Sequence, residues 1–145
     1  MTLSLKRVSS IFIVVKDVKR SVKFYRDTLG FTEAHVEEAF AMLRLGDFDL
    51  MLHRSGTSDV EPLIHGKHPG GGVVFCIEAQ DVKKWAERLK EAGYPPVRGP
   101  VDQPWGRTEL TVDDPDGYRW DLWHRTVGRK VWPPEAKEGG EKKKG

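Results

Sequence analysis

Large aromatic side chains and carboxylates in this sequence could together bind a flat molecule that carries positive charge. Apolar surface supplies affinity for such a molecule, and a few polar groups fix its orientation. Trp105 is predicted to stack on the ligand rings, while Phe40 and Trp123 line the pocket. Three acids are predicted to meet the positive groups. The full set of predicted ligand-binding residues is Phe40, Asp49, Met51, His53, Trp105, Glu109, Asp121 and Trp123.

The surface that carries these residues has a second interpretation. A mixed apolar and charged face can be covered by the second copy of a homodimer instead of by a ligand. Both interpretations hold if the binding site lies at a dimer interface. Glu109 and Asp121 are also a candidate pair for general acid–base catalysis, although anchoring a cation is the favoured role.

The elements that must position these residues occur twice. Residues 17–31 resemble residues 81–94, and each segment predicts a helix that begins at a capping Asp and ends at a Gly, Gly30 or Gly93, suited to a left-handed conformation. An apolar strand precedes each helix, and three further β segments follow it. The predicted strands are residues 11–15, 31–37, 40–45, 48–53, 73–77, 96–101, 107–112 and 118–124. The fold class is therefore α+β, with two βαβββ modules.

Alternation along these strands predicts one face that packs on the helices. Trp120 lies on that face, and Trp85 is assigned to the helix-packing side with it, so both are interpreted as core residues. The predicted core face comprises Ile11, Ile13, Val15, Ala41, Leu43, Leu45, Leu50, Leu52, Val73, Phe75, Ile77, Leu110, Val112, Trp120 and Leu122. The candidate binding residues on the strands fall on the opposite face.

Composition and spacing define the domain limits. We predict one domain over residues 1–125, with modules at about 8–54 and 72–125 joined by a linker at 55–71 rich in Gly, Pro and His. Residues 126–145 form a basic and flexible tail, interpreted as solvated rather than bound to RNA or membrane. A tight turn is expected at Asp114–Gly117.

Charge and hydropathy narrow the function classes. The chain has 24 Lys+Arg and 22 Asp+Glu, a net charge of +2 over 145 residues, so we expect no nucleic-acid partner. No apolar run approaches the roughly 20 residues that span a bilayer, and the first ten residues are too polar for a signal peptide, so we expect a cytoplasmic protein with no membrane partner. Cys76, the single cysteine, lies in an apolar run and is interpreted as a buried, inert thiol.

Other candidate sites are weak. His53 and Asp121 could share a metal, but two ligands fall short of the usual three or four. His65 and His68 have metal-like spacing in a segment of Gly and Pro that offers no rigid support, and His35 and His124 are interpreted as surface or strand-end residues. The glycines at residues 70–72 precede a strand, whereas a phosphate-binding loop follows one and opens a helix.

Two segments carry a family resemblance, IFIVVKDVKRSVKFYRDTLGF at residues 11–31 and QPWGRTELTVDDPDGYRWDLWH at residues 103–124. They resemble the vicinal-oxygen-chelate superfamily, also called the glyoxalase, bleomycin-resistance and dioxygenase fold. Residues 103–106 and residues 35–40 look most like the bleomycin-resistance binding proteins. The resemblance implies curved mixed sheets that form a cup with the helices on the convex side, and a homodimer that sequesters a cationic glycopeptide drug without modifying it.

The same resemblance implies where an enzyme of the superfamily would hold a divalent metal. These positions are occupied here by Ser10, Met51, Gly72 (Val74 if the alignment slips) and Asp121. Only Asp121 is a credible ligand, because a hydroxyl, a thioether and a glycine do not replace imidazole or carboxylate. We therefore expect no metal, no other cofactor and no catalytic residues of the usual type.

Three functions remain in order of preference. The first is an antibiotic-binding protein of the bleomycin-resistance type. The second is a metal-dependent lyase, isomerase or dioxygenase of the same superfamily. The third is a housekeeping member that binds an unrelated metabolite. A bound metal would favour the second function, and a screen of ligands by thermal shift separates the first from the third.

Overall fold

The computed structural model describes residues 3–56 and 73–128, which fall into two compact units. The first unit comprises residues 1–73 together with Asp114–Tyr118, and the second comprises residues 74–113 and 119–145. Several predictions lie outside the described residues: the linker after residue 56, the pair His65 and His68, the glycines at 70–72, and the tail after residue 128.

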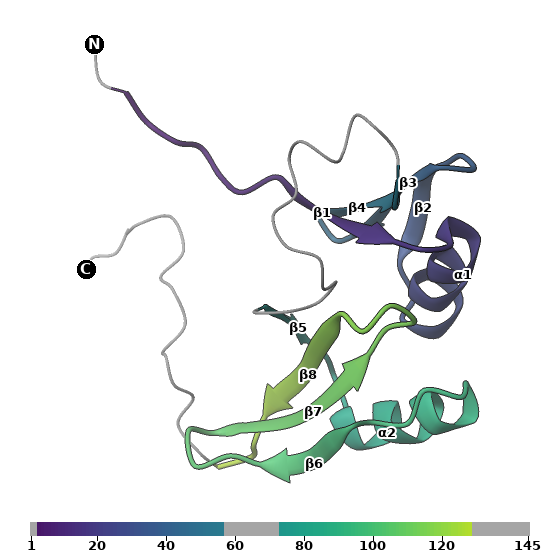
Figure 1. The fold of residues 1–145 in the computed structure, drawn as a ribbon. Coiled ribbons are helices and arrows are strands. Elements are labelled where there is room, and N and C mark those ends of the chain that lie inside the picture. The colour runs from purple at the N-terminus through teal and green to yellow at the C-terminus, as the bar shows by residue number, and fades with distance from the viewer. Residues whose placement is uncertain (1–2, 57–72, 129–145) are drawn as a thin grey trace. The chain divides into compact units, whose positions relative to one another are not determined.

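The first unit is a four-stranded mixed sheet with a helix on one face (Figure 1). The chain runs through β1 (Ser10–Val15), α1 (Val18–Lys23), a π-helical turn η1 (Phe24–Thr28), β2 (Thr32–Val36), β3 (Phe40–Leu45) and β4 (Phe48–Arg54). The strand order is β1-β4-β3-β2, with β1 parallel to β4 and the other pairs antiparallel.

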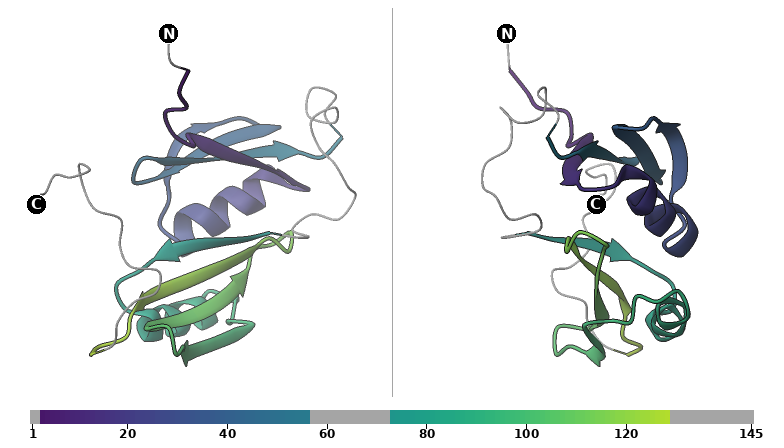
Figure 2. Two further views of the ribbon diagram at one scale, coloured as in Figure 1. Left: turned by 90° about the vertical axis from the view of Figure 1, so that its left-hand side faces the viewer. Right: turned by 45° about the vertical axis from the view of Figure 1, so that its right-hand side comes forward.

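The second unit repeats this arrangement, as Figure 2 shows. Its elements are β5 (Val74–Glu78), α2 (Val82–Glu91), β6 (Arg98–Asp102), β7 (Arg107–Asp113) and β8 (Arg119–Arg125). The order β5-β8-β7-β6 pairs β5 with β8 in parallel. The predicted α+β class with two βαβββ modules is confirmed.

Both predicted helix caps are present. The side chain of Asp17 accepts a hydrogen bond from the Arg20 N–H, and that of Asp81 accepts one from the Lys84 N–H, each at 3.2 Å. Such a bond satisfies one of the backbone donors that a helix start leaves unpaired. The residues that end the helices, Gly30 and Gly93, have φ of 86° and 89° as predicted.

The core of each unit lies between the sheet and its helix. Ala41, Leu43, Leu50 and Leu52 are fully buried in the first unit, and Leu110, Val112, Trp120 and Leu122 are buried in the second. Four other predicted core residues are only half-buried: Ile11, Leu45, Phe75 and Ile77. Val73 precedes β5 and is 41% exposed, so its assignment to the core is wrong. The two tryptophans that were assigned to the core, Trp85 and Trp120, differ from each other in burial.

Trp120 is 2% exposed and fills the core as predicted. Trp85 is only half-buried on α2, and the guanidinium carbon of Arg88 lies 5.2 Å from its ring centroid. The interpretation of Trp85 as core filling is therefore correct only in part. His124, interpreted as a surface or strand-end residue, is half-buried near the end of β8, where its Nδ1 accepts the N–H of Val82 at 2.9 Å.

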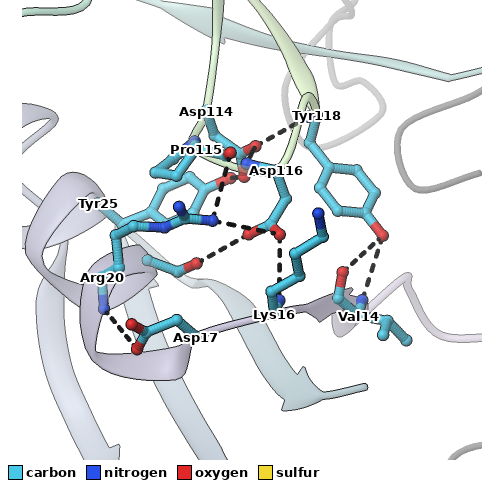
Figure 3. A network of polar contacts seen from close by, with 10 residues as sticks. Val14, Lys16, Asp17, Arg20, Tyr25, Asp114, Pro115, Asp116 and Tyr118 are labelled. Atoms are coloured by element: carbon cyan, nitrogen blue, oxygen red, sulfur yellow. Dashed lines mark hydrogen bonds and ion pairs between the residues drawn. The ribbon is translucent and has the colours of Figure 1, made fainter. Parts of the chain in front are cut away.

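The turn between β7 and β8 belongs to the first unit and is held there by polar contacts (Figure 3). The Tyr25 hydroxyl, placed by η1, donates to Asp114 at 2.6 Å. The Tyr118 hydroxyl donates to the Val14 carbonyl at 3.0 Å and accepts the Val14 N–H at 3.2 Å. Asp116 accepts the Lys16 N–H at 3.1 Å. The predicted tight turn is thus part of the first unit.

None of the helices in residues 3–56 and 73–128 combines the length and the apolar character that a membrane crossing requires.

Candidate functional site

The predicted binding residues divide equally between the two units. Phe40, Asp49, Met51 and His53 belong to the first, and Trp105, Glu109, Asp121 and Trp123 belong to the second. Strand alternation places the strand residues of each group opposite the face that packs on the helix. The candidate residues therefore form two separate groups, one in each unit, and each group is called a half-site.

The half-site of the first unit is a strip of aromatic rings. The His53 ring lies between Phe12 and Phe40, with centroid distances of 4.9 Å to each. All three residues are half-buried, and the neighbouring strands β3 and β4 add Met42 opposite Met51. This surface can hold a flat apolar group by contact area and by ring stacking.

Asp49, the acid of this half-site, has a partner within its own unit. The Arg44 Nε donates to Asp49 Oδ1 at 2.7 Å across the β3–β4 pair. The hydrogen bond from Arg44 lowers the pKa of the Asp49 carboxyl, so Asp49 stays ionised near neutral pH. The Arg44 side chain is 51% exposed, so water also reaches it.

The half-site of the second unit is built around Glu109, which is 8% exposed on β7. Its Oε2 accepts the indole N–H of Trp105 at 3.0 Å. Its Oε1 accepts hydrogen bonds from Arg98 at 3.1 Å and from Gln103 at 3.4 Å. Trp105 remains 42% exposed, so the carboxylate orients a ring that does not fill the core.

Asp121 belongs to the same cluster. It accepts the Thr111 hydroxyl at 2.6 Å, and its second oxygen lies 3.7 Å from Arg98 Nη2. Arg98 also donates from Nε to Thr111 at 3.1 Å. Both acids of this half-site are therefore paired with one arginine.

A bulge in β6 places that arginine. Arg98 pairs with Thr111 and Val101 pairs with Glu109, with an irregularity between them. Gly99 occupies the bulge with φ of +79°, and a Cβ there would lie 2.4 Å from the backbone oxygen of Glu109. Only glycine permits this close approach of β6 to β7.

Trp123 completes the half-site as the cross-strand partner of Glu109. The guanidinium carbon of Arg107 lies 3.7 Å from its ring centroid, a cation–π contact. Trp123 is half-buried, so this contact covers part of the ring that was predicted to line the pocket.

The interpretation of Cys76 as a buried thiol is wrong. Cys76 is exposed on β5, where it pairs with Asp121 of β8. Period-2 alternation turns its side chain away from Phe75 and Ile77, the apolar neighbours on which the interpretation was based. Loss of hydration raises the pKa of the thiol, and the charge of Asp121 adds to this rise, so the thiol stays protonated near neutral pH.

The donor set does not fit a divalent metal. No group of three or more His, Cys, Asp or Glu side chains gathers anywhere in residues 3–56 and 73–128. Ser10 and Val74 begin equivalent strands, seven residues before Asp17 and Asp81, so Val74 matches the metal position better than Gly72. Neither hydroxyl nor isopropyl is a ligand for such an ion.

The hypothesis of a metal between His53 and Asp121 gains no support from their surroundings. The two residues belong to different units, and each is engaged within its own. His53 contacts two phenylalanine rings, and Asp121 binds Thr111 and Arg98.

Sequence reasoning missed four residues of the second half-site: Arg98, Gln103, Arg107 and Thr111. Gln103 stands in the motif with Trp105, and Thr111 lies on the predicted face, so both had a signal. Arg107 is two residues before Glu109 and had the same alternation signal. Arg98 had no such signal, because the bulge in β6 determines where its side chain points.

Known proteins share the sequence pattern and the fold of this chain. A family model described as the glyoxalase/bleomycin resistance protein/dioxygenase superfamily matches residues 7–122. A bleomycin resistance protein of Geobacillus stearothermophilus is 31% identical over 111 residues, which cover 70% of this chain and 84% of the relative.

Two solved structures are similar in fold. A glyoxalase/bleomycin resistance protein/dioxygenase from Nocardioides has a TM-score of 0.71 at 23% identity, covering 94% of this chain and 93% of its own. TnmS3, an antibiotic binding protein from Streptomyces sp. CB03234, has a TM-score of 0.68 at 22% identity, covering 86% of this chain and 100% of its own.

Proposed function

Because the chain belongs to the glyoxalase/bleomycin resistance protein/dioxygenase superfamily, we propose that it sequesters a flat small-molecule antibiotic of the bleomycin type without modifying it. The relative at 31% identity is a bleomycin resistance protein, and a structural neighbour is an antibiotic binding protein. The poor fit of the donor set to a metal supports binding over the metal-dependent chemistry of other members.

The observation that carries the proposal is the state of Trp105. A tryptophan that is 42% exposed but fixed by a 3.0 Å hydrogen bond to Glu109 presents its ring in one orientation. A ring held in this way loses little side-chain entropy when a ligand stacks on it. Such a stack is worth about 1 kcal/mol beyond the buried area.

The charged residues supply the second part of the proposal. Positive groups of the ligand compete with Arg44 for Asp49, the acid of the first half-site. Arg44 is 51% exposed, so water solvates this arginine when it is displaced. An ionic contribution of this kind weakens as salt concentration rises.

The proposal includes a homodimer in which both copies contribute to each binding site. A closed C2 pair is the default assembly for a small protein of this kind. Light scattering at micromolar concentration should give roughly twice the chain mass of 16.5 kDa. A clean monomer would contradict the shared site.

The experiment is calorimetric titration of a bleomycin-type glycopeptide into the native protein and matched variants. Trp105→Ala should weaken binding about tenfold or more, because it removes both the stack and its buried area. Trp105→Phe keeps a ring but loses the N–H, so we expect an intermediate affinity. Trp85→Phe on α2 is the control and should bind like the native protein.

Mass spectrometry of the recovered ligand tests the second half of the proposal. We expect the glycopeptide to return with unchanged mass. A modified ligand would indicate an enzyme, and absence of heat with the native protein would reject the bleomycin-type ligand and favour the unrelated-metabolite hypothesis. A Trp105→Ala variant that unfolds would show that the ring is structural.

A further inference from the structure

The Arg107 side chain carries hydrogen-bond donors that meet no acceptor within residues 3–56 and 73–128. Its Nε is buried without a partner, and its side chain forms no hydrogen bond or ion pair with the residues that the structure describes. Its guanidinium lies instead on the Trp123 ring at 3.7 Å. Nε is itself out of reach of a ligand, but the side chain is only half-buried, and its Nη groups form no hydrogen bond with the described residues. Polar groups in folded proteins nearly always have partners, so these Nη donors point to an acceptor that comes from outside.

The neighbouring acids do not meet this need, because other donors already engage them. Glu109 accepts hydrogen bonds from Trp105, Arg98 and Gln103. Asp121 accepts one from Thr111 and faces Arg98. The acids of this half-site are thus satisfied, and Arg107 is the group left over.

We propose that Arg107 is a specificity-determining residue that donates to a carbonyl or carboxylate oxygen of a planar ligand whose ring lies on Trp105. The inference rests on the proposed function, since it uses the same stacking residue. The planar fork of a guanidinium matches these flat acceptor groups. Stacking on Trp123 restricts the side chain in advance, so less freedom is lost when the ligand binds.

Charge alone would not give this preference. Arg98 and Arg107 balance Glu109 and Asp121, so these four groups sum to zero. Discrimination must then come from hydrogen bonding, and a neutral carbonyl should be accepted along with a carboxylate. A ligand whose polar group is only a cationic donor finds no partner at Arg107.

The test uses three probes that share one ring: naphthoate, naphthamide and naphthylmethylammonium. Titration followed by NMR measures affinities in the weak range expected of such small molecules. For the native protein we expect naphthoate and naphthamide to bind at least tenfold more tightly than naphthylmethylammonium. A difference between the first two probes separates the carboxylate from the carbonyl as the favoured acceptor.

Arg107→Met keeps an unbranched side chain without donors, and it should abolish the preference. Arg107→Lys keeps the charge but loses the fork, so it should reduce the preference, and it replaces the Met variant if that variant does not fold. Arg119→Met is the control, because it removes the same charge from the same face of the sheet, at a residue paired with Asp113 at 2.8 Å. The control should retain the native preference.

Three results would overturn the inference: retention of the preference in the folded Arg107 variants, equal binding of all three probes by the native protein, and binding of none. The proposed function fails differently. It stands if the native protein binds the glycopeptide and Trp105→Ala binds it at least about tenfold more weakly, whatever the Arg107 variants show.

Discussion

Tyr25→Phe removes one hydroxyl from the contact that holds the β7–β8 turn. That hydroxyl donates to Asp114 at 2.6 Å, and Tyr25 and Asp114 are 0% and 5% exposed. A hydrogen bond to a charged group contributes about 1.5–3 kcal/mol, more than a neutral one. We expect a loss of about 2 kcal/mol in the free energy of unfolding near pH 7, or roughly 30-fold in the unfolding equilibrium.

The loss should depend on pH in a known direction. Burial raises the pKa of Asp114, and the hydrogen bonds from Tyr25 and from the backbone of Tyr118 and Asp116 oppose that rise. An acid whose folded pKa is raised adds stability that is fully present below the unfolded pKa and is lost as pH rises through the folded value. Without Tyr25 the folded pKa rises further.

The destabilisation should therefore be smaller at acidic pH, where Asp114 is protonated in the folded state and the lost bond is a neutral one of about 1 kcal/mol. Urea unfolding at several pH values above 4 measures this, and the range avoids the titration of Asp27 and Asp49, whose pKa values lie below the usual value.

Tyr118→Phe is the matched control for this prediction. Tyr118 lies in the same turn, and its hydroxyl bonds the backbone of Val14 in β1 and no acid among the described residues. The control should lose stability by an amount that does not change with pH over the same range. Equal pH profiles for the two variants, or a loss below about 0.5 kcal/mol for Tyr25→Phe, would refute the role of the buried carboxylate.

Three further predictions concern the scaffold and the metal. Gly99→Ala should lower the free energy of unfolding, measured in urea, by more than about 2 kcal/mol, because its Cβ would lie 2.4 Å from the backbone oxygen of Glu109. Gly93→Ala has open space around the new Cβ and should lower it by only about 1 kcal/mol. Equal losses would reject the close approach at Gly99. Asp17→Ala and Asp81→Ala should each cost about 1 kcal/mol, and Asn at either position should restore most of it; no recovery would show that capping is not the cause. Elemental analysis after mild dialysis should find well below one divalent transition metal per chain, and about one per chain would favour an enzyme.

Local signals in the sequence were sufficient for most of the fold. Asp17 and Asp81 each cap a helix by a hydrogen bond to the N–H three residues later, and Gly30 ends a helix by adopting a positive φ. None of these features depends on distant parts of the chain. Period-2 alternation likewise identified the buried face of each sheet. The strand ends agree with the structure within about two residues, because Gly, Pro and Asp mark them directly.

Contacts between distant residues could not be predicted in the same way. The hydrogen bond from Tyr25 to Asp114 joins residues 89 positions apart. Tyr25 also lies in a π-helical turn, which no residue type predicts. Cys76 is exposed because it alternates with Phe75 and Ile77 along β5. Its apolar neighbours in the sequence led to the incorrect interpretation. Side-chain type was enough to select the candidate residues, whereas the hydrogen-bond partners of the acids, such as Arg98, depend on strand register.

The arginine partners of the predicted acids show how register changes a functional argument. Asp49 and Arg44 form a pair whose side chains are 24% and 51% exposed, and such surface pairs contribute at most about 1 kcal/mol. A ligand cation can replace Arg44 there at little cost. Glu109 is different, because its side chain is only 11% exposed and it also orients Trp105. If Arg98 were displaced, only the neutral donors Trp105 and Gln103 would remain to stabilise the buried charge of Glu109. Glu109 is therefore better suited to holding the Trp105 ring, and Asp49 is the first candidate for binding a ligand cation.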